Sequence, residues 1–156
     1  MDLHPNLTPV AELVGTWRGP GRGEYPTIEP FEYTEELTFT NVGKPFLVYL
    51  QRTWSPAGAP MHMESGFLRV PSPDVVEFTI AQPTGQSELA EGRITGSGAD
   101  FTLNLRSQIL NSGTAKHVEE TERNYRRSGD TITVDFSMAA VGEPMTHHLS
   151  STLRRT

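Results

Sequence analysis

Histidine is the residue type of this chain with the widest range of chemistry, because it binds metals and exchanges protons near neutral pH. The chain has five histidines and no cysteine, which excludes disulfides, thiolate metal sites and thiol catalysis. His4 lies near the N-terminus and His117 lies in a charged segment, and both are expected at the surface. The candidates for chemistry are therefore His62 and the adjacent pair His147 and His148.

The pair His147 and His148 lies in a segment, 145–155, that is expected to form the last strand. Neighbouring strand residues point to opposite faces, so at most one of the two rings faces the interior. One face would carry His147 with leucines, and the other would carry His148 with small residues that leave room for a planar cofactor. Alternation alone does not choose between them. The alternative is a surface histidine beside a buried one, with no metal.

His62 lies between Met61 and Met63 in another expected strand. Methionine adapts to irregular cavities, so these two and Met138 are candidates to line a ligand pocket, although such methionines are more often plain core. A buried histidine opposite another across an apolar barrel suits a heme, with one ring on the iron and one on the distal side. Without cysteine the heme would be the non-covalent heme b.

Two other chemistries have less support. A three-histidine zinc site would need a third ligand, because the strands of His62 and His148 supply only two and no His-x-His spacing occurs. Hydrolysis would need an activated nucleophile, and no serine lies in a nucleophile-elbow context. Glu35, Glu36 and Asp74 are interpreted as solvated charges.

The elements that must position these residues are almost all strands. A helical turn or two is expected over 9–14, with Thr8 as its N-cap. Ten segments rich in strand formers then alternate with turns that contain glycine, proline, asparagine or aspartate. The expected strands are 15–23, 31–42, 46–54, 61–71, 74–82, 86–95, 100–110, 116–128, 131–139 and 145–155.

This pattern predicts an all-β, ten-stranded antiparallel up-and-down β-barrel of the lipocalin or fatty-acid-binding-protein type, after a short N-terminal helical turn. Closure removes the exposed edges that so many consecutive strands would otherwise leave, and a β-sandwich is the alternative. The 156 residues fit a single domain, 1–156. Barrels of this size commonly hold one small ligand.

Glycine recurs at alternate positions along the first expected strand, 15–23, and leaves one face bare except for Trp17. Another backbone or a bulky ligand is expected to approach that face closely. The spacing of Gly19 and Gly21 also matches the first two glycines of a Rossmann fingerprint, but Glu24 replaces the third. The barrel interpretation is therefore preferred over a phosphate-binding loop.

The chain has a formal net charge of −6, and its basic residues are paired rather than gathered in a patch. This argues against nucleic acid and anionic membranes as partners, because both require concentrated Lys and Arg. The N-terminus has no basic region followed by an apolar stretch, and no segment has the length of a membrane span. A cytoplasmic protein is expected.

These segments together resemble the nitrobindin family. The N-terminal signature of that family matches Gly15-x-Trp17-x-Gly19-x-Gly21-x-Gly23-x-Tyr25-Pro26-Thr27-Ile28. Further similarity lies in Met61-His62-x-Glu64-Ser65-Gly66 and in His148-Leu149-x-x-x-Leu153. The resemblance covers the chain from about residue 9 to the end.

The resemblance implies a ten-stranded barrel that carries one ferric heme b per subunit. It implies that His148 is the axial ligand of the iron, that His62 lies on the distal side, and that Met61 and Met138 line the cavity. Three polar residues are unranked candidates to contact the heme propionates: Thr34, Lys116 and Arg123.

The resemblance also implies an activity, the isomerisation of peroxynitrite to nitrate, together with binding of nitric oxide. Its partners would be these small molecules and a second copy of the chain in a homodimer. Two alternatives remain open on the residues. One is a nitric oxide carrier or sensor without physiological turnover, and the other is a heme-free, lipocalin-like carrier of a small ligand.

Overall fold

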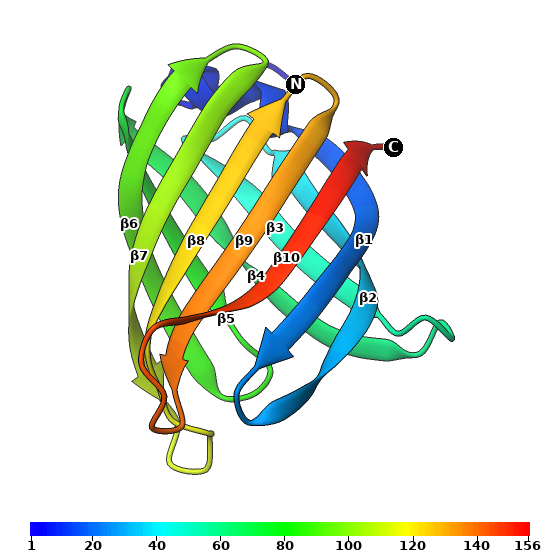
Figure 1. Ribbon diagram of the computed structural model, residues 1–156. Helices are drawn as coiled ribbons and strands as arrows, with labels where there is room; N and C mark the ends of the chain where they lie inside the picture. Colours follow the sequence, from blue (N-terminus) through cyan, green and yellow to red (C-terminus); the bar gives the residue numbers. More distant parts are fainter.

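Ten antiparallel strands close into a barrel in the computed structural model, which describes residues 1–156 (Figure 1). Each strand pairs with its neighbours in sequence, and the last strand pairs with the first. The up-and-down barrel is thus confirmed, and the sandwich alternative is wrong. The strands are β1 (Gly15–Tyr25), β2 (Ile28–Asn41), β3 (Phe46–Trp54), β4 (Pro60–Ser72), β5 (Val75–Ala81), β6 (Gln86–Ser97), β7 (Asp100–Asn111), β8 (Val118–Ser128), β9 (Thr131–Ala140) and β10 (Thr146–Arg155).

The glycine-rich face of β1 points into the barrel, and its neighbours cover it closely. A Cβ on Gly19 would lie 2.0 Å from the carbonyl oxygen of Thr152 in β10, so the closing pair of strands depends on the missing side chain. The rings of Tyr33 and Phe31 in β2 occupy the space beside Gly21 and Gly23. The expected close approach is therefore made by the backbone of β10 and by aromatic side chains of β2.

A 3₁₀ helix, η1 (Pro5–Leu13), covers one end of the barrel (Figure 1). It starts earlier than expected, and its N-cap is His4, whose side chain accepts a hydrogen bond from the N–H of Asn6 at 3.2 Å. The expected cap, Thr8, lies inside the helix and donates to the carbonyl of Pro5. Pro9, in the middle of this segment, lacks the N–H that the interior of an α-helix needs, which favours the short 3₁₀ form.

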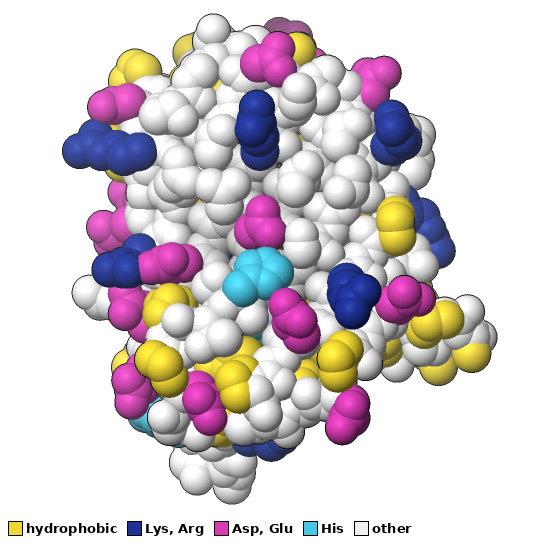
Figure 2. Space-filling model, viewed as in Figure 1, with side chains coloured by type: hydrophobic (Ala, Val, Ile, Leu, Met, Phe, Trp, Pro, Cys, Tyr) yellow, Lys and Arg dark blue, Asp and Glu magenta, His cyan; other side chains and the backbone are white.

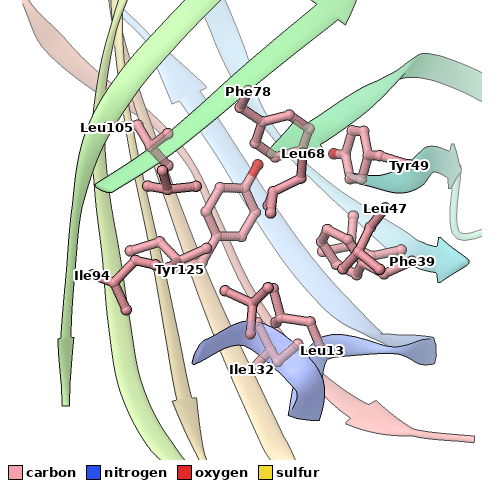
Figure 3. Packing of buried hydrophobic residues seen from close by; sticks show 14 of the residues in the cluster. Leu13, Phe39, Leu47, Tyr49, Leu68, Phe78, Ile94, Leu105, Tyr125 and Ile132 are labelled. Carbon is pink, nitrogen blue, oxygen red and sulfur yellow. The ribbon is translucent and has the colours of Figure 1, made fainter. Parts of the chain in front are cut away.

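The hydrophobic core fills the half of the barrel next to η1 (Figure 3). Leu7, Val10 and Leu13 of η1 are fully buried against side chains that point inward from the strands. Trp17 is also fully buried, and its Nε1–H donates to the carbonyl of Leu13 at 2.9 Å. The guanidinium of Arg155 lies 4.3 Å from the centre of the Trp17 ring. These contacts close this end of the barrel.

The turns β1–β2, β5–β6, β7–β8 and β9–β10 surround the opposite end (Figure 1). Hydrophobic side chains gather toward this lower end in Figure 2, while most Lys and Arg side chains lie higher up and are separated from one another. No helix of the structure is long and apolar enough to cross a bilayer. The open end is where the candidate site lies.

Candidate functional site

A cavity of about 600 Å³ occupies the open half of the barrel. Its mouth is formed by residues of the surrounding turns, and its floor is a layer of buried polar side chains that separates the cavity from the hydrophobic core. Of the four residues predicted to bind the heme or line its pocket, His62, Met138 and His148 line this cavity. A barrel that encloses a cavity of this kind can hold one small ligand or cofactor.

Met61 does not line the cavity. Its side chain is 47% exposed, because it precedes the inward-facing His62 and therefore points to the outer face of β4. Met63 lies on the same outer face and is 46% exposed. The expectation that Met61 lines the cavity is thus wrong, whereas Met138 does line it.

His148 reaches the cavity because of a β-bulge. His147 pairs with Ser137 and Leu149 pairs with Phe136, so His148 is an extra residue in β10 without a partner in β9. Bulges re-aim side chains, and here the bulge turns His148 inward together with Leu149. His147 remains exposed and its ring nitrogen lies 3.1 Å from Asp135.

The ring of His148 is held by a hydrogen bond and by aromatic neighbours. Its Nδ1 lies 2.9 Å from the carbonyl oxygen of Glu24, an acceptor only, so Nδ1 carries the proton and Nε2 keeps its lone pair. The rings of Tyr25, Phe31 and Phe136 lie with their centres 5.3, 6.2 and 6.1 Å away. Burial lowers the pKa of His148, which favours the neutral ring.

This arrangement fits an axial heme ligand. Histidines that bind metals commonly donate their second ring N–H to a carbonyl, as Nδ1 of His148 does to Glu24, and the ligating nitrogen must be unprotonated. Apolar side chains wall the cavity around it, among them Phe136, Met138 and Leu149. No three His, Asp or Glu side chains converge to bind a metal ion, so the zinc interpretation finds no site.

His62 lines the cavity from β4 and is fixed at both its backbone and its ring. The hydroxyl of Thr53 accepts from the N–H of His62 at 2.9 Å and donates to the carbonyl oxygen of His62 at 3.2 Å. These two hydrogen bonds connect the strands where the β3–β4 pairing is irregular. Its ring Nε2 lies 2.7 Å from Oε1 of Gln82. Sequence analysis did not single out Gln82, which follows β5 in the turn to β6.

The cavity floor contains an acid–arginine cluster formed by Glu64, Glu88 and Arg123. Nη1 and Nη2 of Arg123 donate to the two oxygens of Glu64 at 2.7 and 3.0 Å. Nε and Nη2 donate to Glu88 at 3.0 and 2.9 Å, and Nη1 also donates to the Tyr125 hydroxyl at 3.1 Å. These bonds use all five N–H groups of the guanidinium, so Arg123 has none left for a heme propionate.

The charges of this cluster stabilise one another. Burial alone would raise the pKa of Glu64, but Arg123 beside it and several hydrogen bonds hold that pKa well below 4.5. Burial likewise opposes the charge on Arg123, and Glu64 and Glu88 outweigh it, so that its pKa lies well above the ordinary value. Of the other propionate candidates, Lys116 lines the cavity and Thr34 does not.

Glu35 is buried, contrary to the interpretation that it is a solvated charge. It accepts from Ser151 at 2.6 Å and from Nε2 of Gln51 at 2.9 Å, and burial raises its pKa. Strand alternation places Glu35 on the inward face of β2 with Leu37. That alternation was the available signal, whereas Glu36 points outward and pairs with exposed arginines.

The chain is similar to known proteins along nearly its whole length. The family profile described as THAP4-like, heme-binding β-barrel domain matches residues 6–155. A peroxynitrite isomerase of Nocardia farcinica is 51% identical over 155 residues, which cover 98% of this chain and 92% of that protein. Peroxynitrite isomerase 2 of Mycobacterium marinum is 49% identical over 156 residues, which cover 99% of this chain and 97% of that protein. The crystal structure of Rv2717c from M. tuberculosis has a TM-score of 0.97 at 43% identity, covering 99% of both chains.

Proposed function

The chain belongs to the family of THAP4-like heme-binding β-barrel domains, and from this premise we propose that it is a heme-dependent peroxynitrite isomerase. The observation that carries the proposal is His148, whose Nε2 makes no hydrogen bond at the barrel cavity while Nδ1 is bound to the Glu24 carbonyl. The reaction is inferred from the names of the relatives, and His148 is the residue at which we expect the heme to bind.

We propose that the chain holds one non-covalent heme b, in the ferric state, with His148 as the axial ligand. The absence of cysteine leaves no thioether attachment. The apolar wall around Phe136, Met138 and Leu149 suits the porphyrin faces. Among the three candidates for binding the heme propionates, Lys116 fits best. It lines the cavity, whereas Thr34 does not and the guanidinium of Arg123 is fully paired.

When bound, the heme supplies an iron that acts as a Lewis acid toward the peroxynitrite oxygens. The carbonyl of Glu24 orients His148 and increases the electron-donating power of its Nε2. The rings of Tyr25 and Phe136 pack beside His148, and its burial favours the neutral ring that can bind a metal. Nitrate is an anion and finds no unpaired guanidinium on the cavity floor, so the floor does not retain the product.

Hemin titration tests the site assignment. Wild-type protein should give a sharp ferric Soret band at one hemin per chain, and His148→Ala should lose that band or change it. His147→Ala is the matched control, because its neighbouring ring lies outside the barrel and contacts Asp135. An unchanged spectrum in His148→Ala would contradict the assignment, and no hemin uptake by wild type would favour the heme-free carrier.

Stopped-flow kinetics test the reaction. The loaded protein should convert peroxynitrite to nitrate faster than free hemin at equal concentration, and His148→Ala should approach the rate of free hemin. The same position should bind nitric oxide, which a shift of the Soret band would report. Nitric oxide binding without nitrate formation beyond that of free hemin would favour a carrier or sensor.

A further inference from the structure

Gln82 connects the ring of His62 to the acid–arginine cluster on the cavity floor. Its Nε2 donates to Glu64 at 2.6 Å and to Glu88 at 3.0 Å, and its Oε1 lies 2.7 Å from Nε2 of His62. The backbone of Gln82 is itself fixed, because its N–H donates to Gln86 and its carbonyl accepts from Gly85. The amide therefore has a defined place between the histidine and the two carboxylates.

The two carboxylates determine which way the Gln82 amide faces. Carboxylate oxygens accept hydrogen bonds, so the NH₂ group must face Glu64 and Glu88 and the carbonyl oxygen must face His62. An acceptor against Nε2 of His62 requires that Nε2 carry a proton. The nitrogen of His62 that most often binds metals is thus occupied by its own hydrogen bond.

His62 and His148 line the same cavity, His62 from β4 and His148 from β10. A heme held by His148 would leave the second axial position of the iron facing this cavity. A histidine there with a free Nε2 would compete with peroxynitrite or nitric oxide for that position. Something must prevent this competition if exogenous ligands are to bind.

We propose that Gln82 is a positioning residue that ties Nε2 of His62 to the cavity wall and keeps it from binding the heme iron. The second axial position is then left to exogenous ligands, and His62 contributes to the cavity through the rest of its ring. This inference rests on the proposed function, because it presupposes a heme held by His148. It assigns to Gln82 an effect on ligand access and not a contact with the reacting atoms.

The first test uses the protein without heme. In ¹⁵N spectra of the wild type at about pH 8, where free histidine is neutral, His62 should show an Nε2 proton in slow exchange and an unprotonated Nδ1. Gln82→Met removes the acceptor at similar length, so that proton should exchange rapidly. Gln51→Met is the matched control, since Gln51 also lines the cavity but binds Glu35 and no histidine.

The second test uses hemin-loaded protein. Gln82→Met should acquire the absorption and electron paramagnetic resonance signature of a low-spin, bis-histidine ferric heme, and Gln82→Met/His62→Leu should lose it again. If His62 fills the second axial position in about nine of ten molecules, azide should bind ~10-fold more weakly to Gln82→Met. Gln51→Met should keep the wild-type spectrum. Gln82→Asn, which keeps the amide but is one methylene short of His62, is a second variant if Gln82→Met does not fold.

The outcomes separate the two proposals. If the wild type takes up no hemin, the proposed function fails, while the ¹⁵N spectra of the apoprotein still report whether Gln82 holds His62. If the wild type binds hemin through His148 but Gln82→Met keeps its spectrum and azide affinity, the role of Gln82 is overturned. A rapidly exchanging Nε2 proton, or an Nδ1–H tautomer, in the wild-type apoprotein would overturn it as well.

Discussion

Two buried carboxyl groups of the cavity floor respond to pH in opposite ways. Burial raises the pKa of Glu35 above 4.5, and its partners Ser151 and Gln51 are neutral. Burial acts on Glu64 too, but Arg123 outweighs it and holds that pKa well below 4.5. A carboxyl group that holds its proton more tightly when folded costs stability as pH rises, and one that holds it less tightly costs stability as pH falls.

Glu35→Gln is expected to stabilise the protein at pH 7. Below pH 4.5 the carboxyl of Glu35 is protonated in both folded and unfolded states, so it carries no ionisation penalty there. As pH rises through 4.5 the unfolded chain ionises first, and the wild type loses stability that the glutamine variant keeps. Urea unfolding at a series of pH values should show a gain that grows with pH, and a constant difference would contradict this account.

Glu64→Gln is the matched comparison, and it is expected to lower the free energy of unfolding at neutral pH. It leaves the Arg123 guanidinium buried with half of its charge partners removed, which should cost about 3–5 kcal/mol of unfolding free energy at neutral pH. The loss should shrink as pH falls through the lowered pKa of Glu64, because the wild-type carboxylate then becomes protonated too. Equal losses at all pH values would show that the charge of Glu64 is not what the cluster needs.

At the scale of the elements, alternation and turn residues were sufficient to predict ten strands, because each strand has an inward face and ends at a turn. They were not sufficient for β10. The bulge at His148 shifts the alternation by one residue, and nothing in the local sequence marks it. Only the resemblance to a family pointed to His148, and the ladder with β9 then accounts for its direction.

The acid–arginine cluster was missed for a different reason. Glu64, Glu88 and Arg123 come from β4, β6 and β8, which are not adjacent strands, and they meet only across the interior. Alternation within one strand identifies an inward residue, but it does not say which residues of distant strands lie at the same height. Those heights depend on the register of every strand pair between them.

The seam between β1 and β10 is predicted to be intolerant of side chains at Gly19. Gly19→Ala would place a methyl group 2.0 Å from the Thr152 carbonyl, so the strands would have to move apart. We expect a loss of ~1–3 kcal/mol of unfolding free energy, measured by urea unfolding. Gly113→Ala is the control, because a Cβ there meets no atom within 4 Å. Equal stability of both variants would mean that the seam accommodates the methyl group.

At the scale of the whole molecule, an apolar row crosses the outer surface in register. Val48, Phe67, Thr79 and Leu89 are successive cross-strand partners from β3 to β6, and Phe67 and Leu89 are 48% and 40% exposed. The resemblance to nitrobindins implied a homodimer, and this row is a surface on which a second copy would bury apolar area.

Phe67→Glu should therefore produce a monomer if the protein is a dimer in solution. A carboxylate in the middle of this row would have to be buried without a partner, which opposes association. Light scattering after size exclusion measures the mass directly. Thr152→Glu, on the exposed face of β10 at the opposite side of the barrel, should leave the mass unchanged. A wild-type protein that is monomeric at all concentrations would remove the basis for this prediction.

Both ends of the chain lie at the covered end of the barrel, beside η1 and away from the cavity mouth (Figure 1). The final residue, Thr156, donates its N–H to Thr16 in β1, and β10 and β1 are partners in the same closed sheet. The connectivity is therefore nearly circular. The barrel could be opened at another tight turn and residues 1 and 156 joined by a linker, and a passenger domain fused at either of these positions would lie at the covered end while the mouth stays clear.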